Sequence, residues 1–125
     1  MRDYHRLQIW RRAHALALAT HEVARALRGN EFASLRAQLT RAADSVAATI
    51  VEGCGAASVR EFARYLDMCI KSASETEYHL LSARDRRALG YRSWQMLSGE
   101  AVQIRRMVYA YRKRLLEEDG ARAPR

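Results

Sequence analysis

The side chains best suited to binding or acid–base chemistry lie on one edge of a predicted helix over residues 31–52. They are Gln38, Arg41, Ser45 and Glu52, and their spacings of three, four and seven residues place them beside the apolar face of that helix. One interpretation is a polar network that fixes helix register or a subunit contact, which we favour because no nucleophile, histidine or glycine-rich loop joins the four residues. The other is a site for a small ligand or for acid–base catalysis.

Two carboxylates follow in the next predicted helix, over residues 58–86. Glu77 lies near the edge of its apolar face, where we expect it to join this polar network by pairing with Arg41 across the bundle. Glu75 points about 200° away round the helix, so the two carboxylates cannot flank one bond as the pair of a glycosidase does. The sequence therefore predicts no catalytic residues here.

Metal-ligating residues are few and badly spaced for a shared site. The chain has four histidines: His5, His14, His21 and His79. His14 and His21 are seven residues apart, whereas two ligands on one helix usually lie three or four apart, and no Glu-x-x-His motif occurs. Cys54 and Cys69 form no Cys-x-x-Cys pair. We therefore expect no metal, no cofactor and no enzymatic activity.

Basic residues give the chain a formal charge of +8, from 22 Lys and Arg against 14 Asp and Glu. Several of them cluster in the second half of the chain: Arg84, Arg86, Arg87, Arg105, Arg106, Arg112 and Lys113. Tyr109 lies among them, and basic groups with aromatic side chains on one surface are typical of RNA binding. Arginine from a GC-rich genome, and cations at the end of a helix, are the alternative explanation.

The sequence pattern predicts helices along most of the chain. Apolar residues recur at steps of three and four in segments of about 7–27, 31–52, 58–86 and 93–116, and the one proline is Pro124. Short loops between long helices predict antiparallel neighbours. We therefore expect one all-α domain over residues 1–116, an antiparallel up-and-down four-helix bundle, followed by a disordered charged tail over 117–125.

Local signals place the helix ends and the core. Gly53 is the expected C-cap of the second helix, and Ser58 with Glu61 is a capping box that opens the third. The fourth helix carries a regular heptad: Trp94, Leu97, Ala101, Ile104, Val108, Tyr111 and Leu115. Such a heptad predicts a packed seam with Ile104 at its middle.

Apolar residues also lie outside the predicted core. The first helix has a second stripe, formed by Leu7, Trp10, His14, Leu18 and His21. The third helix directs Met68, Tyr78 and Leu81 outward. A monomer rarely exposes so much apolar surface, so we expect a homo-oligomer. The chain shows no signal-peptide pattern and no span long enough to cross a membrane, which favours the cytoplasm and no membrane partner.

Four motifs of the chain match one known sequence pattern. The first is formed by Trp10 and Arg12–Ala17, and the second is an Arg-Ala-Ala-x-Ser…Glu-Gly signature formed by Arg41, Ala42, Ala43, Ser45, Ile50, Glu52 and Gly53. The third is formed by Glu61, Phe62, Tyr65 and Leu66, and the fourth by Ser72, Ala73, Glu75 and Glu77. Together they resemble a family of small bacterial proteins named for reading frames inside 23S ribosomal RNA intervening sequences. Ala47 and Thr49 depart from the pattern, where the family has Pro and Asn.

The resemblance covers residues 7–116 and implies a four-helix bundle that assembles as a ring, with a homopentamer favoured. It also implies a link to nucleic acid, since related accessory proteins of diversity-generating retroelements bind it. Our hypothesis is a non-enzymatic homo-oligomeric scaffold that binds RNA or DNA through its basic surface. The alternatives are a protein-interaction or structural module with no nucleic-acid role, and a small-ligand-binding bundle that uses the Arg41/Glu52 edge.

Overall fold

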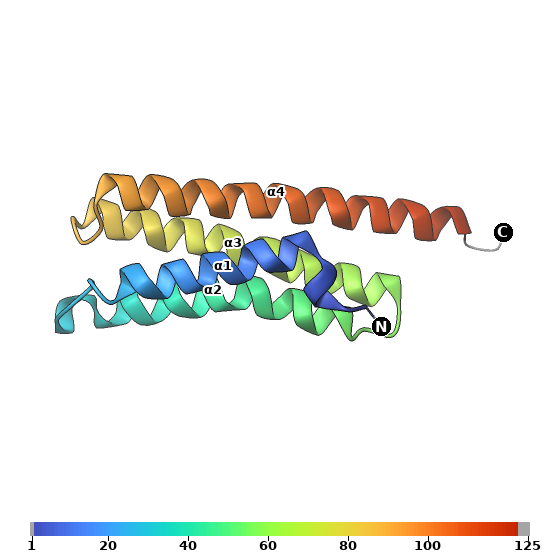
Figure 1. Ribbon diagram of the computed structural model, residues 1–125, viewed down its shortest axis with the longest axis horizontal. Coiled ribbons are helices and arrows are strands. Elements are labelled where there is room, and N and C mark those ends of the chain that lie inside the picture. Colours follow the sequence, from blue (N-terminus) through green and yellow to red (C-terminus); the bar gives the residue numbers. More distant parts are fainter. Residues whose placement is uncertain (1, 123–125) are drawn as a thin grey trace.

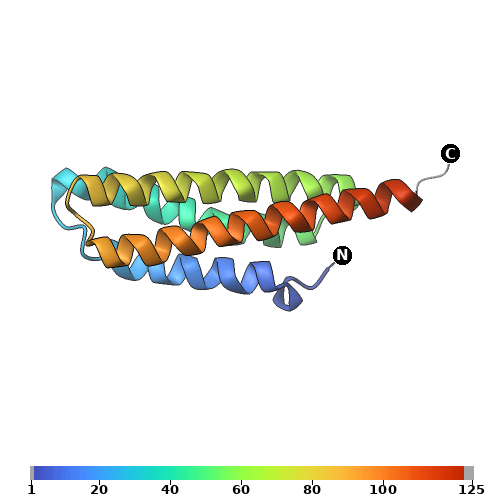
Figure 2. The ribbon, with the colours of Figure 1, turned by 90° about the horizontal axis from the view of Figure 1, so that it is seen from above.

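The computed structural model describes residues 2–122, which form four long helices: α1 Gln8–Ala24, α2 Ala33–Cys54, α3 Val59–Asp85 and α4 Tyr91–Arg122. Short 3-10 turns precede α1 and α2, and the described residues contain no strand. Successive helices run in opposite directions (Figures 1 and 2). The prediction of an all-α four-helix bundle is therefore confirmed. No helix in this part of the chain is both long and apolar enough to cross a membrane.

Each helix packs against the next one in the chain, and α1 closes the bundle against α4 through the smallest of the four contacts. This last contact is bridged by Arg12, whose Nε and Nη2 each donate to a carboxylate oxygen of Glu100 at 2.8 Å. These hydrogen bonds lower the pKa of Glu100, so the ion pair is formed at neutral pH.

The core lies where the apolar stripes of all four helices meet. In α4 the predicted heptad is confirmed: Leu97, Ala101, Ile104, Val108 and Leu115 are buried, and Trp94 and Tyr111 pack against the core from its edge. The apolar stripe of α3 is buried in the same way, from Phe62 to Ala83. Helix periodicity thus located the core correctly on both elements.

The predicted capping box at the start of α3 is present. The Ser58 hydroxyl accepts a hydrogen bond from the Glu61 backbone N–H at 3.1 Å. The prediction for Gly53 is wrong, because α2 continues through Cys54 and Gly55 follows its end. Gly53 is buried inside the helix, where a Cβ atom would lie 2.7 Å from Phe62 Cδ1 and 2.9 Å from Tyr65 Cβ. This glycine lets α3 approach α2 closely rather than ending a helix.

Two other helix ends differ from expectation. Helix α1 stops at Ala24, but Leu27 remains buried in the turn that follows, and Gly29 adopts a φ of 88°. Helix α4 continues to Arg122, so residues 117–122 are helical and not disordered, while 123–125 lie outside the described residues. Adding a residue to an existing helix costs far less than starting one, which explains this extension of a packed helix. The end of α4 projects past the other helices (Figure 1).

The two positions that depart from the family pattern lie in the second half of α2. The helix is continuous from Ala33 to Cys54, with Ala47 buried inside it. The Thr49 hydroxyl is satisfied within the same helix, because it donates to the Ser45 carbonyl oxygen at 2.7 Å. Neither substitution therefore leaves an unpaired polar group in the core.

Candidate functional site

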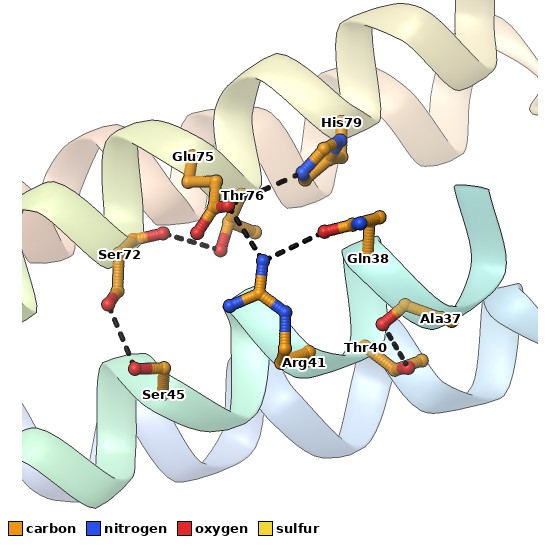
Figure 3. Close-up of polar contacts among 9 residues, drawn as sticks. All are labelled: Ala37, Gln38, Thr40, Arg41, Ser45, Ser72, Glu75, Thr76 and His79. Carbon is orange, nitrogen blue, oxygen red and sulfur yellow. Dashed lines mark hydrogen bonds and ion pairs between the residues drawn. The ribbon is translucent and has the colours of Figure 1, made fainter. Parts of the chain in front are cut away.

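Arg41 is the centre of a polar cluster between α2 and α3 (Figure 3). Its Nη2 donates to Gln38 Oε1 at 2.8 Å and to Glu75 Oε2 at 2.9 Å. The expected pairing of Arg41 with Glu77 is wrong. Glu77 faces α4 instead, where it accepts from Arg105 Nε at 2.7 Å. Because the two glutamates point to different sides of α3, each serves a different neighbouring helix.

The cluster extends to residues that the sequence reasoning did not assign to it. Ser45 accepts a hydrogen bond from Ser72 at 3.0 Å, and His79 Nε2 lies 3.7 Å from Glu75 Oε2. Glu52 is exposed and joins none of these contacts within residues 2–122. The four-residue spacing of Glu75 and His79 was the available signal, since it places both side chains on one edge of α3.

The geometry of this cluster is that of a structural network. The charges of Arg41 and Glu75 are paired with each other, and both side chains are substantially exposed. The Ser72 hydroxyl donates a hydrogen bond to the Ser45 hydroxyl, and both side chains are half-buried. The contacts therefore link α2 to α3, and the charges of Arg41 and Glu75 are matched to each other.

A second group of side chains forms what we call the α4 basic surface: Arg105, Arg106, Tyr109, Arg112 and Lys113. Two of its cations are anchored to α3, because Arg105 is hydrogen-bonded to Glu77 and Arg112 Nε donates to the Ala63 carbonyl oxygen at 2.8 Å. The hydrogen bond to Glu77 raises the pKa of Arg105.

The remaining two cations of this surface, Arg106 and Lys113, are fully on the solvent side of α4. Neither has an ion-pair partner among the residues that the structure describes. Their spacing of seven residues puts them on one face, about 10.5 Å apart along the helix axis. The α4 basic surface therefore combines two fixed cations with two that are available to an outside anion.

The cluster at the turn between α3 and α4 behaves differently. Arg84 is paired with Asp85 at 2.9 Å and lies 4.2 Å over the Trp94 ring, and Arg86 Nη2 donates to the Glu31 carbonyl oxygen at 3.0 Å. Arg87 has a φ of 61°. This cluster lies at the other end of α4, roughly 30 Å from Lys113 by helix rise. The structure thus separates the seven predicted basic residues into two groups.

The histidines and cysteines are dispersed. His21 Nε2 lies 2.9 Å from Asp44 Oδ1, and His14 stacks on Trp10. Within residues 2–122, no three His, Cys, Asp or Glu side chains gather as metal ligands would. Cys54 and Cys69 are buried free thiols, and burial raises the pKa of Cys69 to about 12. A thiol that remains protonated at neutral pH is a poor nucleophile.

Comparison with known proteins supports the fold and the family. The chain is similar to a protein of unknown function from the S23 ribosomal protein family of Bacteroides thetaiotaomicron, a solved structure that it matches with a TM-score of 0.79 and 20% identity. The match covers 84% of this chain and 98% of the other, so the two share the bundle. No curated protein matches the sequence. The sequence pattern of the 23S rRNA-intervening sequence protein family matches residues 5–110, and the chain therefore belongs to that family.

Proposed function

We propose that this protein is a non-enzymatic, homo-oligomeric helical scaffold that binds RNA or DNA through the α4 basic surface. The observation that carries the proposal is the pair of exposed cations Arg106 and Lys113, neither of which has an ion-pair partner within residues 2–122. Between residues 91 and 116, α4 has six basic residues and a single acidic one, Glu100, which is already neutralised by Arg12. Glu77 compensates Arg105, whereas Arg106 and Lys113 have no ion-pair partner within residues 2–122, so the middle of α4 has a net positive charge before the acidic residues Glu117, Glu118 and Asp119.

Such a surface favours a polyanion for a physical reason. When the phosphates of a nucleic acid bind these cations, condensed counterions are released from the nucleic acid. The affinity therefore falls steeply as the salt concentration rises. Two cations per chain give only weak binding. In an oligomer each chain would present the same pair, and weak contacts on one strand would then add by multivalency.

The test reverses the two free charges in Arg106→Glu/Lys113→Glu. We expect this variant to lose most of its affinity for a fluorescently labelled RNA at low salt, measured by anisotropy, and to lose the salt dependence as well. The matched control is Arg25→Glu/Arg60→Glu, which changes the net charge equally at two exposed positions outside α4. The control is compared with the wild type at 0.1 M salt, where it should weaken binding only slightly, because charge is screened beyond about 10 Å at that ionic strength.

Two results would contradict the proposal. Wild-type protein that does not bind RNA or DNA at low salt would favour the alternative, a protein-interaction module without a nucleic-acid role. That alternative has its own support in the exposed apolar side chains Leu18 and Tyr78. Equal binding by the wild type and the α4 variant would instead move the interface to Arg84, Arg86 and Arg87.

The proposal also includes a cytoplasmic location and a ring-shaped oligomer with five subunits favoured. Two free cysteines, both buried, are consistent with a reducing compartment. A small-ligand site at the Arg41 edge receives no support from the geometry, because Arg41 and Glu75 neutralise each other.

A further inference from the structure

Tyr109 is surrounded by positive charge in a way that follows directly from helix geometry. On an α-helix the side chains adjacent to residue i are those at i−4, i−3, i+3 and i+4. For Tyr109 these four positions are Arg105, Arg106, Arg112 and Lys113. All four neighbours of this aromatic ring on α4 are therefore basic.

The surface is hollowed on both sides of this ring. One hollow, of 270 Å³, is lined by Ile70 of α3 together with Arg105, Arg106 and Tyr109. The other, of 320 Å³, is lined by Tyr109, Arg112, Lys113, Leu116 and Glu117. Tyr109 is the only residue that the two hollows share, so its side chain forms the wall between them.

The Tyr109 ring is open to a ligand. It is 61% exposed and takes part in none of the aromatic or cation–π contacts found in residues 2–122. Tyr111 in the same helix is the contrasting case, because its half-buried ring contacts Phe62 and lies under Arg114. Burial of apolar surface in the bundle therefore explains Tyr111 and leaves Tyr109 unexplained.

We propose that the α4 basic surface selects single-stranded over double-stranded nucleic acid, with an unpaired base stacked on Tyr109 and its flanking phosphates on Arg106 and Lys113. This inference rests on the proposed function and adds the substrate class. In a duplex the faces of the bases are covered by their neighbours, so a protruding ring reaches only phosphates and sugars. In a single strand the base faces are accessible, and stacking on an aromatic ring adds affinity with little dependence on sequence.

The anchored cations support this arrangement. Arg105 and Arg112 are held by Glu77 and by the Ala63 carbonyl oxygen, so the side of each hollow nearest α3 has a fixed shape. Arg106 and Lys113 lie on the opposite side of Tyr109, one turn before it and one turn after it. A strand that follows α4 would therefore meet a cation, the ring and a second cation in that order.

The experiment compares two probes at low salt by fluorescence anisotropy: an unstructured 12-nucleotide RNA of mixed sequence, and the same strand annealed to its complement. Wild-type protein should bind the single strand more tightly. Tyr109→Ala should weaken single-strand binding about tenfold and leave duplex binding within twofold, since only the stacked base is lost. Tyr109→Phe should bind both probes as the wild type does, because it keeps the ring.

The matched control is Tyr91→Ala, which removes a second exposed tyrosine at the first residue of α4, far along the helix from the α4 basic surface. It should leave the affinity for both probes unchanged. Alanine is a better helix former than tyrosine, so neither variant should unfold α4, and circular dichroism checks this.

Each other outcome overturns the inference in a distinct way. Equal affinity of Tyr109→Ala and wild type for the single strand removes the stacking role, and the proposed function survives if Arg106→Glu/Lys113→Glu still abolishes binding. Wild-type affinity for the duplex that equals or exceeds that for the single strand removes the selectivity. If light scattering shows that Tyr109→Ala forms a smaller oligomer than the wild type, the Tyr109 side chain lies at a subunit contact and does not bind a base. Absence of binding to both probes would overturn the inference and the proposed function together.

Discussion

Ile104 lies at the middle of the α4 seam and has no solvent-accessible surface. We predict that Ile104→Ala lowers the free energy of unfolding by about 2–5 kcal/mol, because it removes buried methyl groups and leaves a cavity. Reversible urea denaturation measures the change. The adjacent position provides the control, since Gln103 is exposed and Gln103→Ala should change the free energy by less than about 0.5 kcal/mol. Similar effects at both positions would show that this stretch of α4 does not pack as described.

Single-residue features were predictable from the sequence to the extent that they depend on periodicity. The heptad identified Ile104 and its buried neighbours because burial follows from the position of a residue around its helix. Ion-pair partners were not predictable in the same way. Arg41 pairs with Glu75 and Glu77 pairs with Arg105, and the choice depends on which helix lies on each side of α3. That arrangement is a property of three helices packed together, which the spacing on one helix does not contain.

At the scale of whole helices, two glycines inside helices provide a test with opposite expected signs. A Cβ on Gly53 would lie 2.7 Å from Phe62 Cδ1 and 2.9 Å from Tyr65 Cβ, so Gly53→Ala should push α3 away from α2 and cost about 1–3 kcal/mol. Gly99 in α4 has no atom within 4 Å of such a Cβ, so Gly99→Ala should stabilise the protein by about 0.5–1 kcal/mol.

Thermal or urea denaturation of the two glycine variants measures both effects with the same assay. Because each variant adds one methyl group to a helix, each acts as the control for the other. Stabilisation by Gly53→Ala would contradict the close approach of α2 and α3 seen in the structure. A loss of stability in Gly99→Ala would mean that this face of α4 is covered by something, such as a second subunit.

The sequence predicted the existence and order of the helices better than their ends. Ser58 and Glu61 fixed the start of α3 because a cap is a local interaction between residues three apart. Gly53 was misread because a glycine that ends a helix and a glycine that permits close packing look the same in one chain. The extension of α4 through residues 117–122 was missed because charged, surface-exposed residues carry no apolar pattern.

For the whole molecule, the main prediction concerns assembly. Leu18 on α1 and Tyr78 on α3 are 59% and 64% exposed, and Met68 and Leu81 are also partly exposed. The expectation that these side chains point outward is therefore confirmed, and the oligomer remains a prediction. Multi-angle light scattering should give a mass near five times that of the 14.3 kDa chain. Tyr78→Glu should reduce that mass if α3 lies at a subunit contact, and a monomeric wild type at micromolar concentration would contradict the prediction.

Part of the second stripe on α1 is covered by contacts within the same chain. Trp10 belongs to that stripe, yet it packs against Tyr4 and stacks with His14 within the same chain. His21 is paired with Asp44 of α2. Only part of the stripe therefore remains for a partner. Periodicity revealed that these residues lie outside the core, but the N-terminal turn that covers some of them has no such pattern.

The up-and-down order of the helices also bears on how quickly the chain finds its fold. The larger contacts are between α1 and α2, α2 and α3, and α3 and α4, all of which are neighbours in the sequence. Contacts of this local kind close short loops, and bundles built from them fold in microseconds to milliseconds. The Arg12–Glu100 pair joins residues at distant points of the chain. The α1–α4 contact thus joins the two helices that are farthest apart in the sequence, so taken as an isolated step it would lose the most chain entropy of the four contacts.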